Sequence, residues 1–126
     1  MSPSAYSCKL KTIDEAQQMK QISVINSLIV PPEMVDKALE IREVYMDYFR
    51  KQPGFVSATF YKSINADNQF NYINIVVWES LEAFQTVVNK GFENEDGLNE
   101  DNMKVLGKGF PEPIKIAPGQ YEVIAG

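Results

Sequence analysis

One central segment constrains the fold most, because it alternates like a strand, is apolar on both faces and runs directly into a helix start. Residues 70–84 read Phe-Asn-Tyr-Ile-Asn-Ile-Val-Val-Trp-Glu-Ser-Leu-Glu-Ala-Phe. In a strand, one face carries Phe70, Tyr72, Asn74, Val76 and Trp78, and the other carries Ile73, Ile75 and Val77. A strand covered on both sides buries the amide of Asn74, and an unpaired buried amide costs about 1–3 kcal/mol. A protein neighbour, a trapped water or a bound ligand must therefore pair with Asn74.

The rest of the chain alternates between strand and helix patterns. Residues 21–30 alternate as a strand, which Pro31 and Pro32 end, and a long helix follows until Pro53 and Gly54. Next, the sequence predicts a strand at 55–63, a turn at 65–68, the strand at 70–78, and a helix from the N-cap Ser80 to a stop at Gly91. After this helix, it predicts an acidic loop at 93–101, a helical turn at 103–106, and two short strands around 114–116 and 121–124.

The long helix is amphipathic. Its apolar stripe is predicted to contain Met34, Ala38, Ile41, Tyr45 and Tyr48, widened by Val35, Leu39, Val44 and Phe49. The charged residues are expected outside this stripe: Asp36, Lys37, Glu40, Arg42, Glu43 and Arg50.

This order predicts an α+β fold of the ferredoxin-like, split βαβ type, with helices on one face of an antiparallel sheet. Residues 1–20 are expected to form a polar N-terminal arm, and residues 21–126 the domain. The sheet face without helices is predicted to be apolar, with Val56, Ala58, Phe60, Ile73, Ile75 and Val77. Because a second copy of the sheet is the simplest cover, we predict a homodimer that packs as a dimeric α+β barrel.

Composition excludes several kinds of chemistry. The chain has no histidine and one cysteine, Cys8. Catalytic triads, histidine-ligated zinc or haem and thiolate clusters are therefore ruled out, and we expect neither a metal nor a cofactor. A lone cysteine fits the reducing cytoplasm. With a net charge of −5 and scattered basic residues, we expect no nucleic-acid partner, and no apolar run approaches the roughly 18 residues of a membrane span.

Three short motifs resemble the antibiotic biosynthesis monooxygenase superfamily of dimeric α+β barrels. They are Gln52-Pro53-Gly54-Phe55 after the long helix, Asn74-x-x-x-Trp78-Glu79-Ser80 where strand meets helix, and Tyr121-Glu122-Val123 near the end. The members that form polyketide quinones oxidise an electron-rich anthrone with molecular oxygen, without flavin, haem or metal. The resemblance implies a cofactor-independent monooxygenase that uses O2 to oxidise a small aromatic or polyketide-like substrate.

The resemblance also implies the catalytic residues. In the quinone-forming members, a tryptophan and two asparagines line the pocket. By resemblance, the tryptophan falls on Trp78 and the asparagines fall on Asn74 and Asn26. The two amides would donate hydrogen bonds to a developing enolate oxygen, and Trp78 would stack on a flat ring or donate from its indole nitrogen. The candidate substrate-binding residues are Tyr45, Tyr48, Tyr72, Val76 and Phe84. Two features depart from the family pattern: Phe84 stands where a tyrosine occurs, and no arginine here matches the one that such pockets can use.

Other functions stay open. The chain would alternatively be a non-catalytic dimeric barrel that binds a small molecule or has a structural role, since fold does not fix function. A carbanion-forming isomerase needs a pocket-facing acid or base, which the sequence does not offer. The haem-degrading branch binds iron through a helix histidine, which this chain lacks. A cavity on the order of a few hundred Å³ bordered by Asn26, Asn74 and Trp78 would favour a ligand site, and a filled interior would favour a structural role.

Overall fold

The computed structural model describes residues 20–88, 101–103 and 109–126. Its elements are, in chain order, β1 (Ile22–Ile29), the 3-10 helix η1 (Pro32–Met34), α2 (Val35–Arg50), β2 (Phe55–Lys62), β3 (Tyr72–Trp78), α3 (Leu81–Val88) and β4 (Lys115–Tyr121). Four predicted features lie outside the described residues except at their ends: the arm at 1–20, the stop at Gly91, the acidic loop at 93–101 and the helical turn at 103–106.

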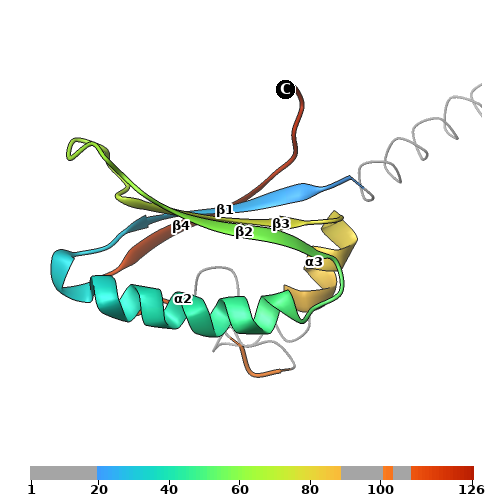
Figure 1. Ribbon diagram of the computed structural model, residues 1–126, viewed down its shortest axis with the longest axis horizontal. Helices are drawn as coiled ribbons and strands as arrows, with labels where there is room; N and C mark the ends of the chain where they lie inside the picture. The colour runs from blue at the N-terminus through green and yellow to red at the C-terminus, as the bar shows by residue number, and fades with distance from the viewer. Residues whose placement is uncertain (1–19, 89–100, 104–108) are drawn as a thin grey trace, which may run out of the picture.

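The four strands form one antiparallel sheet in the order β2-β3-β1-β4. Both helices lie on one side of this sheet: α2 runs along it and α3 stands at one end (Figure 1). This is the split βαβ arrangement of ferredoxin-like folds, so the predicted α+β class is confirmed. The hairpin of β2 and β3 is confirmed as well.

Local chemistry explains the junction between β3 and α3. The Oγ of Ser80 accepts a hydrogen bond of 3.0 Å from the backbone N–H of Ala83, so Ser80 is the predicted N-cap. The carbonyl of Gly54 accepts a hydrogen bond of 2.8 Å from the backbone N–H of Glu79. Gly54 has a φ of 90°, in the left-handed region, and a Cβ on it would collide with the Cβ of Ala83. A glycine is therefore needed where β2, β3 and α3 meet.

The core lies between the sheet and the helices and has two parts. The first surrounds Trp78 and contains Ile22, Val24, Met46, Val76, Trp78, Phe84, Val87 and Val88. The second lies toward the other end of the sheet and contains Leu28, Val30, Ala38, Tyr72 and Ile114. The side chain of Asn71 borders this second part, since its amide forms two hydrogen bonds with the backbone of Val30, at 2.8 and 2.7 Å.

The prediction that Ala58 and Phe60 lie on the open face of the sheet was wrong. A bulge between Phe55 and Ser57 inserts one residue, so the alternation reverses beyond it. Ala58 and Phe60 consequently pack against the two core clusters on the helix side instead of lying on the open face. Val56, next to the bulge, is exposed.

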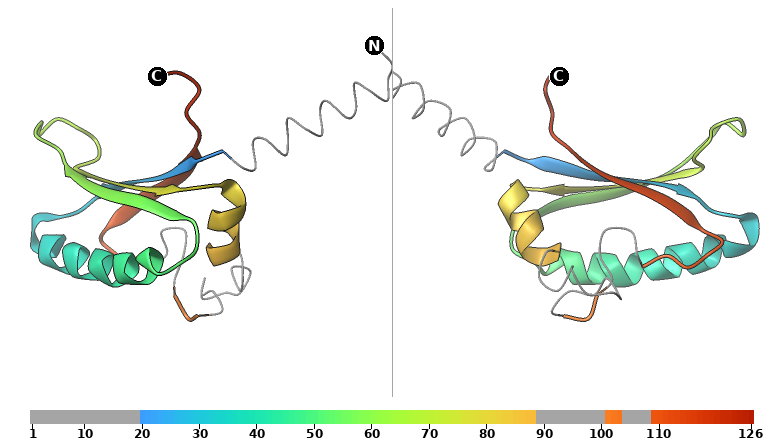
Figure 2. Two further views of the ribbon diagram at one scale, coloured as in Figure 1. Left: turned by 45° about the vertical axis from the view of Figure 1, so that its right-hand side comes forward. Right: turned by 180° about the vertical axis from the view of Figure 1, so that it is seen from behind.

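The prediction of two short closing strands was also wrong. One strand, β4, runs through Pro118 and Gly119, and residues 122–126 have no regular structure. Pro118 is tolerated because β4 is an edge strand, where the unpaired side of the ladder needs no N–H donor. The tail after β4 leaves the sheet on the side away from the helices (Figure 2).

The buried stripe of α2 differs from the predicted one. Its buried residues are Ala38 and Met46, and Arg42 is half-buried between them. Leu39 and Val44, which were expected to widen the stripe, are exposed. The helix is therefore rotated relative to the expected face, and this rotation brings a charged residue toward the sheet.

Candidate active site

A partly enclosed cavity lies between the sheet and α2. It is lined by Val24, Asn26, Arg42, Tyr45, Met46, Phe49, Asn74, Val76, Trp78, Phe84, Val88, Gly109 and Phe110. Its volume is about 50 Å³, smaller than the enclosed cavity on the order of a few hundred Å³ expected for a ligand site, and its mouth is open to solvent. All three candidate catalytic residues, Asn26, Asn74 and Trp78, border it.

Asn26 and Asn74 form the polar centre of the sheet wall. They are direct partners across β1 and β3, so their side chains leave the helix-facing side of the sheet next to each other. The Cβ atoms of such a pair are about 4.5–5.5 Å apart. Asn74 is buried, and the buried Oδ1 of Asn26 accepts no hydrogen bond from any described residue. The cavity therefore presents two adjacent amides, one of which lacks a partner for its oxygen.

Arg42 faces these amides from α2, and its role is the main residue assignment that the sequence missed. Its Nε donates a hydrogen bond of 2.8 Å to Oδ1 of Asn74. Its Cζ lies 4.9 Å from the ring centroid of Phe60, a cation–π distance, and Phe60 is the partner of Asn74 on β2. The bond and the ring together hold the guanidinium against the sheet. The spacing Ala38-Arg42-Met46, four residues per step, places Arg42 on the same helix face as its two buried neighbours.

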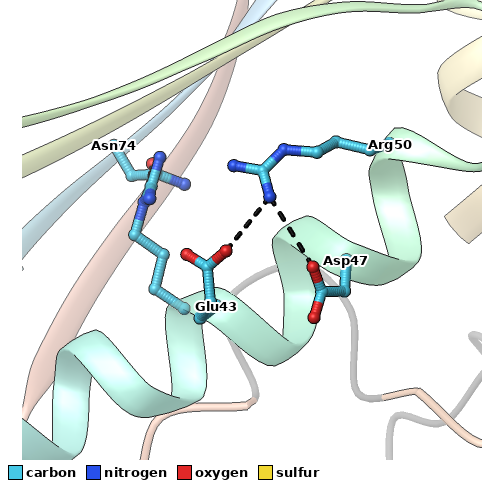
Figure 3. Close-up of polar contacts among 5 residues, drawn as sticks. Glu43, Asp47, Arg50 and Asn74 are labelled. Carbon is cyan, nitrogen blue, oxygen red and sulfur yellow. Dashed lines mark hydrogen bonds and ion pairs between the residues drawn. The ribbon is translucent and has the colours of Figure 1, made fainter.

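The charge of Arg42 has no partner carboxylate within ion-pair distance among the described residues. The neighbouring carboxylates of Glu43 and Asp47 instead contact Arg50, at 3.1 and 3.7 Å (Figure 3). Burial lowers the pKa of the Arg42 guanidinium, whereas the charge of Glu43 raises it. Because an arginine stays protonated in proteins, the cavity holds a fixed, partly desolvated positive charge.

Trp78 forms the aromatic end of the cavity. Its side chain is 1% exposed and meets the ring of Phe49 edge-on at 5.7 Å, with Phe84 tilted at 6.1 Å. Along β3, Trp78 lies four residues from Asn74, which corresponds to about 13 Å. A ligand that contacts both residues therefore has a polar end at the amides and an apolar body toward the tryptophan.

Three of the five predicted substrate-binding residues line the cavity, and two do not. Val76, Phe84 and Tyr45 line the cavity. Tyr72 does not line it, because its ring is buried in the second core cluster and stacks on Phe60 at 5.4 Å. Tyr48 does not line it either, and its hydroxyl donates a hydrogen bond of 2.7 Å to Oδ2 of Asp101.

Gly109 and Phe110 close the side of the cavity next to Tyr45, and both were missed from sequence. A Cβ on Gly109 would collide with the hydroxyl and ring of Tyr45, so only a glycine allows the tyrosine its present position. The contact links residues far apart in the chain, which explains why no local sequence pattern indicated it.

The described residues contain no cluster of three or more side chains suited to a metal ion. No described helix is long and apolar enough to cross a membrane. What the cavity offers to a ligand is one cation, two amides and a largely aromatic surround. This set is suited to binding and orienting a flat, oxygen-bearing molecule.

Comparison with known proteins gives a family and a fold. The family model described as antibiotic biosynthesis monooxygenase matches residues 21–90. No curated protein matches the chain. Among solved structures, a candidate monooxygenase from Shewanella loihica PV-4 has a TM-score of 0.63 at 23% identity, covering 85% of this chain and 97% of that one.

Two further solved structures share the fold at lower identity. A mutant of SnoaB, a cofactor-independent oxygenase from Streptomyces nogalater, has a TM-score of 0.57 at 18% identity, covering 85% of this chain and 96% of that one. The heme-degrader MhuD from Mycobacterium tuberculosis, solved with two hemes in its active site, has a TM-score of 0.54 at 19% identity, covering 83% of this chain and 97% of that one.

Proposed function

This chain belongs to the antibiotic biosynthesis monooxygenase family, and from that premise we propose that it is a cofactor-independent monooxygenase that oxidises a small aromatic or polyketide-like substrate with O2. The single observation that carries the proposal is the cavity in which Asn26, Asn74 and Trp78 meet. The name of SnoaB, a cofactor-independent oxygenase of the same fold, agrees with it.

The proposed reaction needs little from the protein beyond binding and electrostatics. An electron-rich phenol that has lost a proton is able to give an electron to O2 itself. The overall change converts a ring CH2 and O2 into a ring carbonyl and water. The amides of Asn26 and Asn74 and the charge of Arg42 stabilise the anionic oxygen that develops in the substrate. Trp78 and its aromatic neighbours orient the rings and exclude water.

Oxygen uptake tests the proposal. The purified protein is incubated with a panel of anthrones and hydroquinones, with matched anaerobic samples, and O2 consumption is compared with the uncatalysed rate. We expect uptake above that rate, lowered at least about tenfold in Asn74→Ala and in Trp78→Phe. Asn68→Ala is the matched control, because Asn68 is exposed in the hairpin turn and its Nδ2 bonds only Ser63 there. Far-UV circular dichroism of each variant verifies that it is folded.

The same experiment separates the proposal from a non-catalytic barrel. Absence of uptake with every member of the panel, together with measurable binding of those compounds, would favour the binding protein. A haem-degrading role has no support in the residues. MhuD is a heme-degrader, and its branch is expected to bind iron through a helix histidine. This chain has no histidine.

We also propose that two copies of the chain pair through the open face of the sheet. On the two central strands, the registers place Ile25, Ile29, Ile73, Ile75 and Val77 on that face, together with Ser23 and Ser27. The edge strand β2 adds Ser57, Thr59 and Tyr61. Apolar side chains predominate on the two central strands, as is typical of the centre of a protein–protein interface. The exposed Val123 and Ile124 lie in the tail on the same side of the sheet (Figure 2).

Light scattering coupled to gel filtration tests the pairing. We expect a dimer for the native chain and a monomer for Ile75→Lys, because a charge at the centre of the apolar face would have to be buried without a partner. Leu39→Lys is the matched control: it places the same charge at an exposed position of α2 on the opposite layer, and the dimer should persist. A monomeric native chain at micromolar concentration would refute the pairing.

A further inference from the structure

We propose that the cavity selects a two-ring aromatic acid that carries its anionic oxygen next to a hydroxyl group, with Arg42 binding the anion and Oδ1 of Asn26 accepting a hydrogen bond from the hydroxyl. This inference deepens the proposed function and rests on the same cavity being the substrate site. It names the chemical class that the site takes and two residues that set it.

The first observation is the unbalanced charge of Arg42. The guanidinium is half-buried at the cavity wall, and among the described residues no carboxylate lies within ion-pair distance. Its Nε is used by Asn74, and the structure gives its two terminal nitrogens no hydrogen-bond acceptor in the described part of the chain. A partly desolvated cation with free donors is best satisfied by an anion that enters the cavity.

The second observation concerns the two amides beside it. Oδ1 of Asn74 already accepts from Arg42, so what Asn74 offers a ligand is its NH2 group, a donor. Oδ1 of Asn26 is buried and accepts from no described residue, so Asn26 offers a hydrogen-bond acceptor in addition to its NH2 donor. A ligand that is anionic at Arg42 and Asn74 must therefore present a hydrogen-bond donor, such as a hydroxyl, to Asn26.

Geometry places these two ligand groups on neighbouring atoms. Asn26 and Asn74 are cross-strand partners, so their Cβ atoms are about 5 Å apart. Hydrogen bonds that leave two such amides in one direction converge on oxygens attached to adjacent ring positions. A ring hydroxyl beside a carboxylate, or beside an ionised phenol, meets this requirement.

The rest of the cavity sets the size of the ligand. From the amides, the cavity continues over Val76 toward Phe49 and Trp78, and its mouth is open to solvent. The span from Asn74 to Trp78 is about 13 Å along β3, which accommodates two fused rings and their polar groups. The ring faces then meet aromatic edges, a favourable geometry for stacking and edge contacts.

Anaerobic binding tests the inference independently of oxidation. Titration calorimetry measures binding of 3-hydroxy-2-naphthoate, 2-naphthoate and 3-hydroxy-2-naphthamide, which separate the contributions of charge and hydroxyl. The fluorescence of Trp78, the only tryptophan of the chain, shows whether each ligand occupies the cavity. We expect 3-hydroxy-2-naphthoate to bind about tenfold more tightly than either analogue, since each lacks one hydrogen-bonding feature.

Variants assign the two preferences to residues. Arg42→Met should remove the preference for the acid over the amide and leave the preference for the hydroxyl. Asn26→Val should do the reverse. Arg50→Met is the matched control, because Arg50 lies on the same helix but is exposed and paired with Glu43 and Asp47. Arg42→Gln repeats the charge removal with a polar side chain and guards against a folding defect in the first variant.

A further ligand distinguishes the two sources of the anion. Binding of 2,3-dihydroxynaphthalene is measured below and above its first ionisation. If 2,3-dihydroxynaphthalene binds more tightly only once it is ionised, and Arg42→Met loses this gain, the site takes a phenolate. If 3-hydroxy-2-naphthoate binds more tightly than 2,3-dihydroxynaphthalene at all pH values, the site takes a carboxylate.

Three outcomes would overturn the inference: equal affinity for acid and amide in the native chain, unchanged affinity for the acid in Arg42→Met, or no binding of any ligand. A chain that binds the acid as described but never consumes O2 would refute the monooxygenase and leave the specificity standing.

Discussion

Replacing the two paired asparagines by valine should change stability in opposite directions. Asn26 and Asn74 occupy the same row of the sheet, but only Asn74 has its amide oxygen paired, at 2.8 Å from Nε of Arg42. The oxygen of Asn26 is buried without a partner among the described residues. Because the backbone environment is nearly the same, the two substitutions isolate the difference in hydrogen bonding.

The expected magnitudes follow from that difference. In Asn26→Val, removal of an unsatisfied buried acceptor recovers about 1–3 kcal/mol, and valine suits the middle of a strand. The free energy of unfolding should therefore rise by about 1–3 kcal/mol. In Asn74→Val, loss of a charge-assisted hydrogen bond costs about 1.5–3 kcal/mol, and the added apolar burial offsets roughly 1 kcal/mol. The free energy of unfolding should fall by about 0.5–2 kcal/mol.

Urea unfolding followed by far-UV circular dichroism measures both values. All samples are compared at one protein concentration, because the stability of an oligomer depends on concentration. Both variants should retain the native slope of the unfolding free energy with urea, which shows that the denatured state is unchanged. If both substitutions shift the unfolding free energy in the same direction, the assignment of an unpaired acceptor to Asn26 is wrong.

Three further predictions concern positions that shape the site from a distance. Gly54→Ala should lower the unfolding free energy by at least about 1–2 kcal/mol, since φ is 90° and the new Cβ would collide with that of Ala83, and urea unfolding measures this. Ser80→Ala removes the N-cap of α3 and should cost about 1 kcal/mol in the same assay, whereas Ser80→Asp should cost much less. Gly109→Ala should displace Tyr45 and weaken ligand binding to the cavity while leaving far-UV circular dichroism unchanged, and native affinity in calorimetry would contradict this.

The sequence predicted the fold well because the fold depends on patterns that are local. The alternation of residues 70–78 and the start of α3 at Ser80 follow from short-range chemistry, and both were confirmed. The shared face of Asn74 and Trp78 was confirmed for the same reason. On β2, the bulge next to Val56 inserts one residue and reverses the alternation of faces beyond it. No residue type at this place indicates the insertion.

The cation of the cavity was harder to predict. Arg42 was expected outside the apolar stripe of α2, because charged residues are rarely buried. Its spacing of four residues from both Ala38 and Met46 puts it on the buried face, and the long arginine stem allows the charge to reach the sheet. Only its three-dimensional partners, Asn74 and Phe60, show what the charge contacts.

The two walls of the cavity differ in how freely they are able to vary. Trp78 and Val76 belong both to the cavity and to the main core cluster, so a change in either alters folding and ligand fit together. Arg42 on α2 also faces the cavity but belongs to neither core cluster. A laboratory selection for new substrates should therefore collect its tolerated substitutions at Arg42, with Trp78 and Val76 remaining as the fixed template.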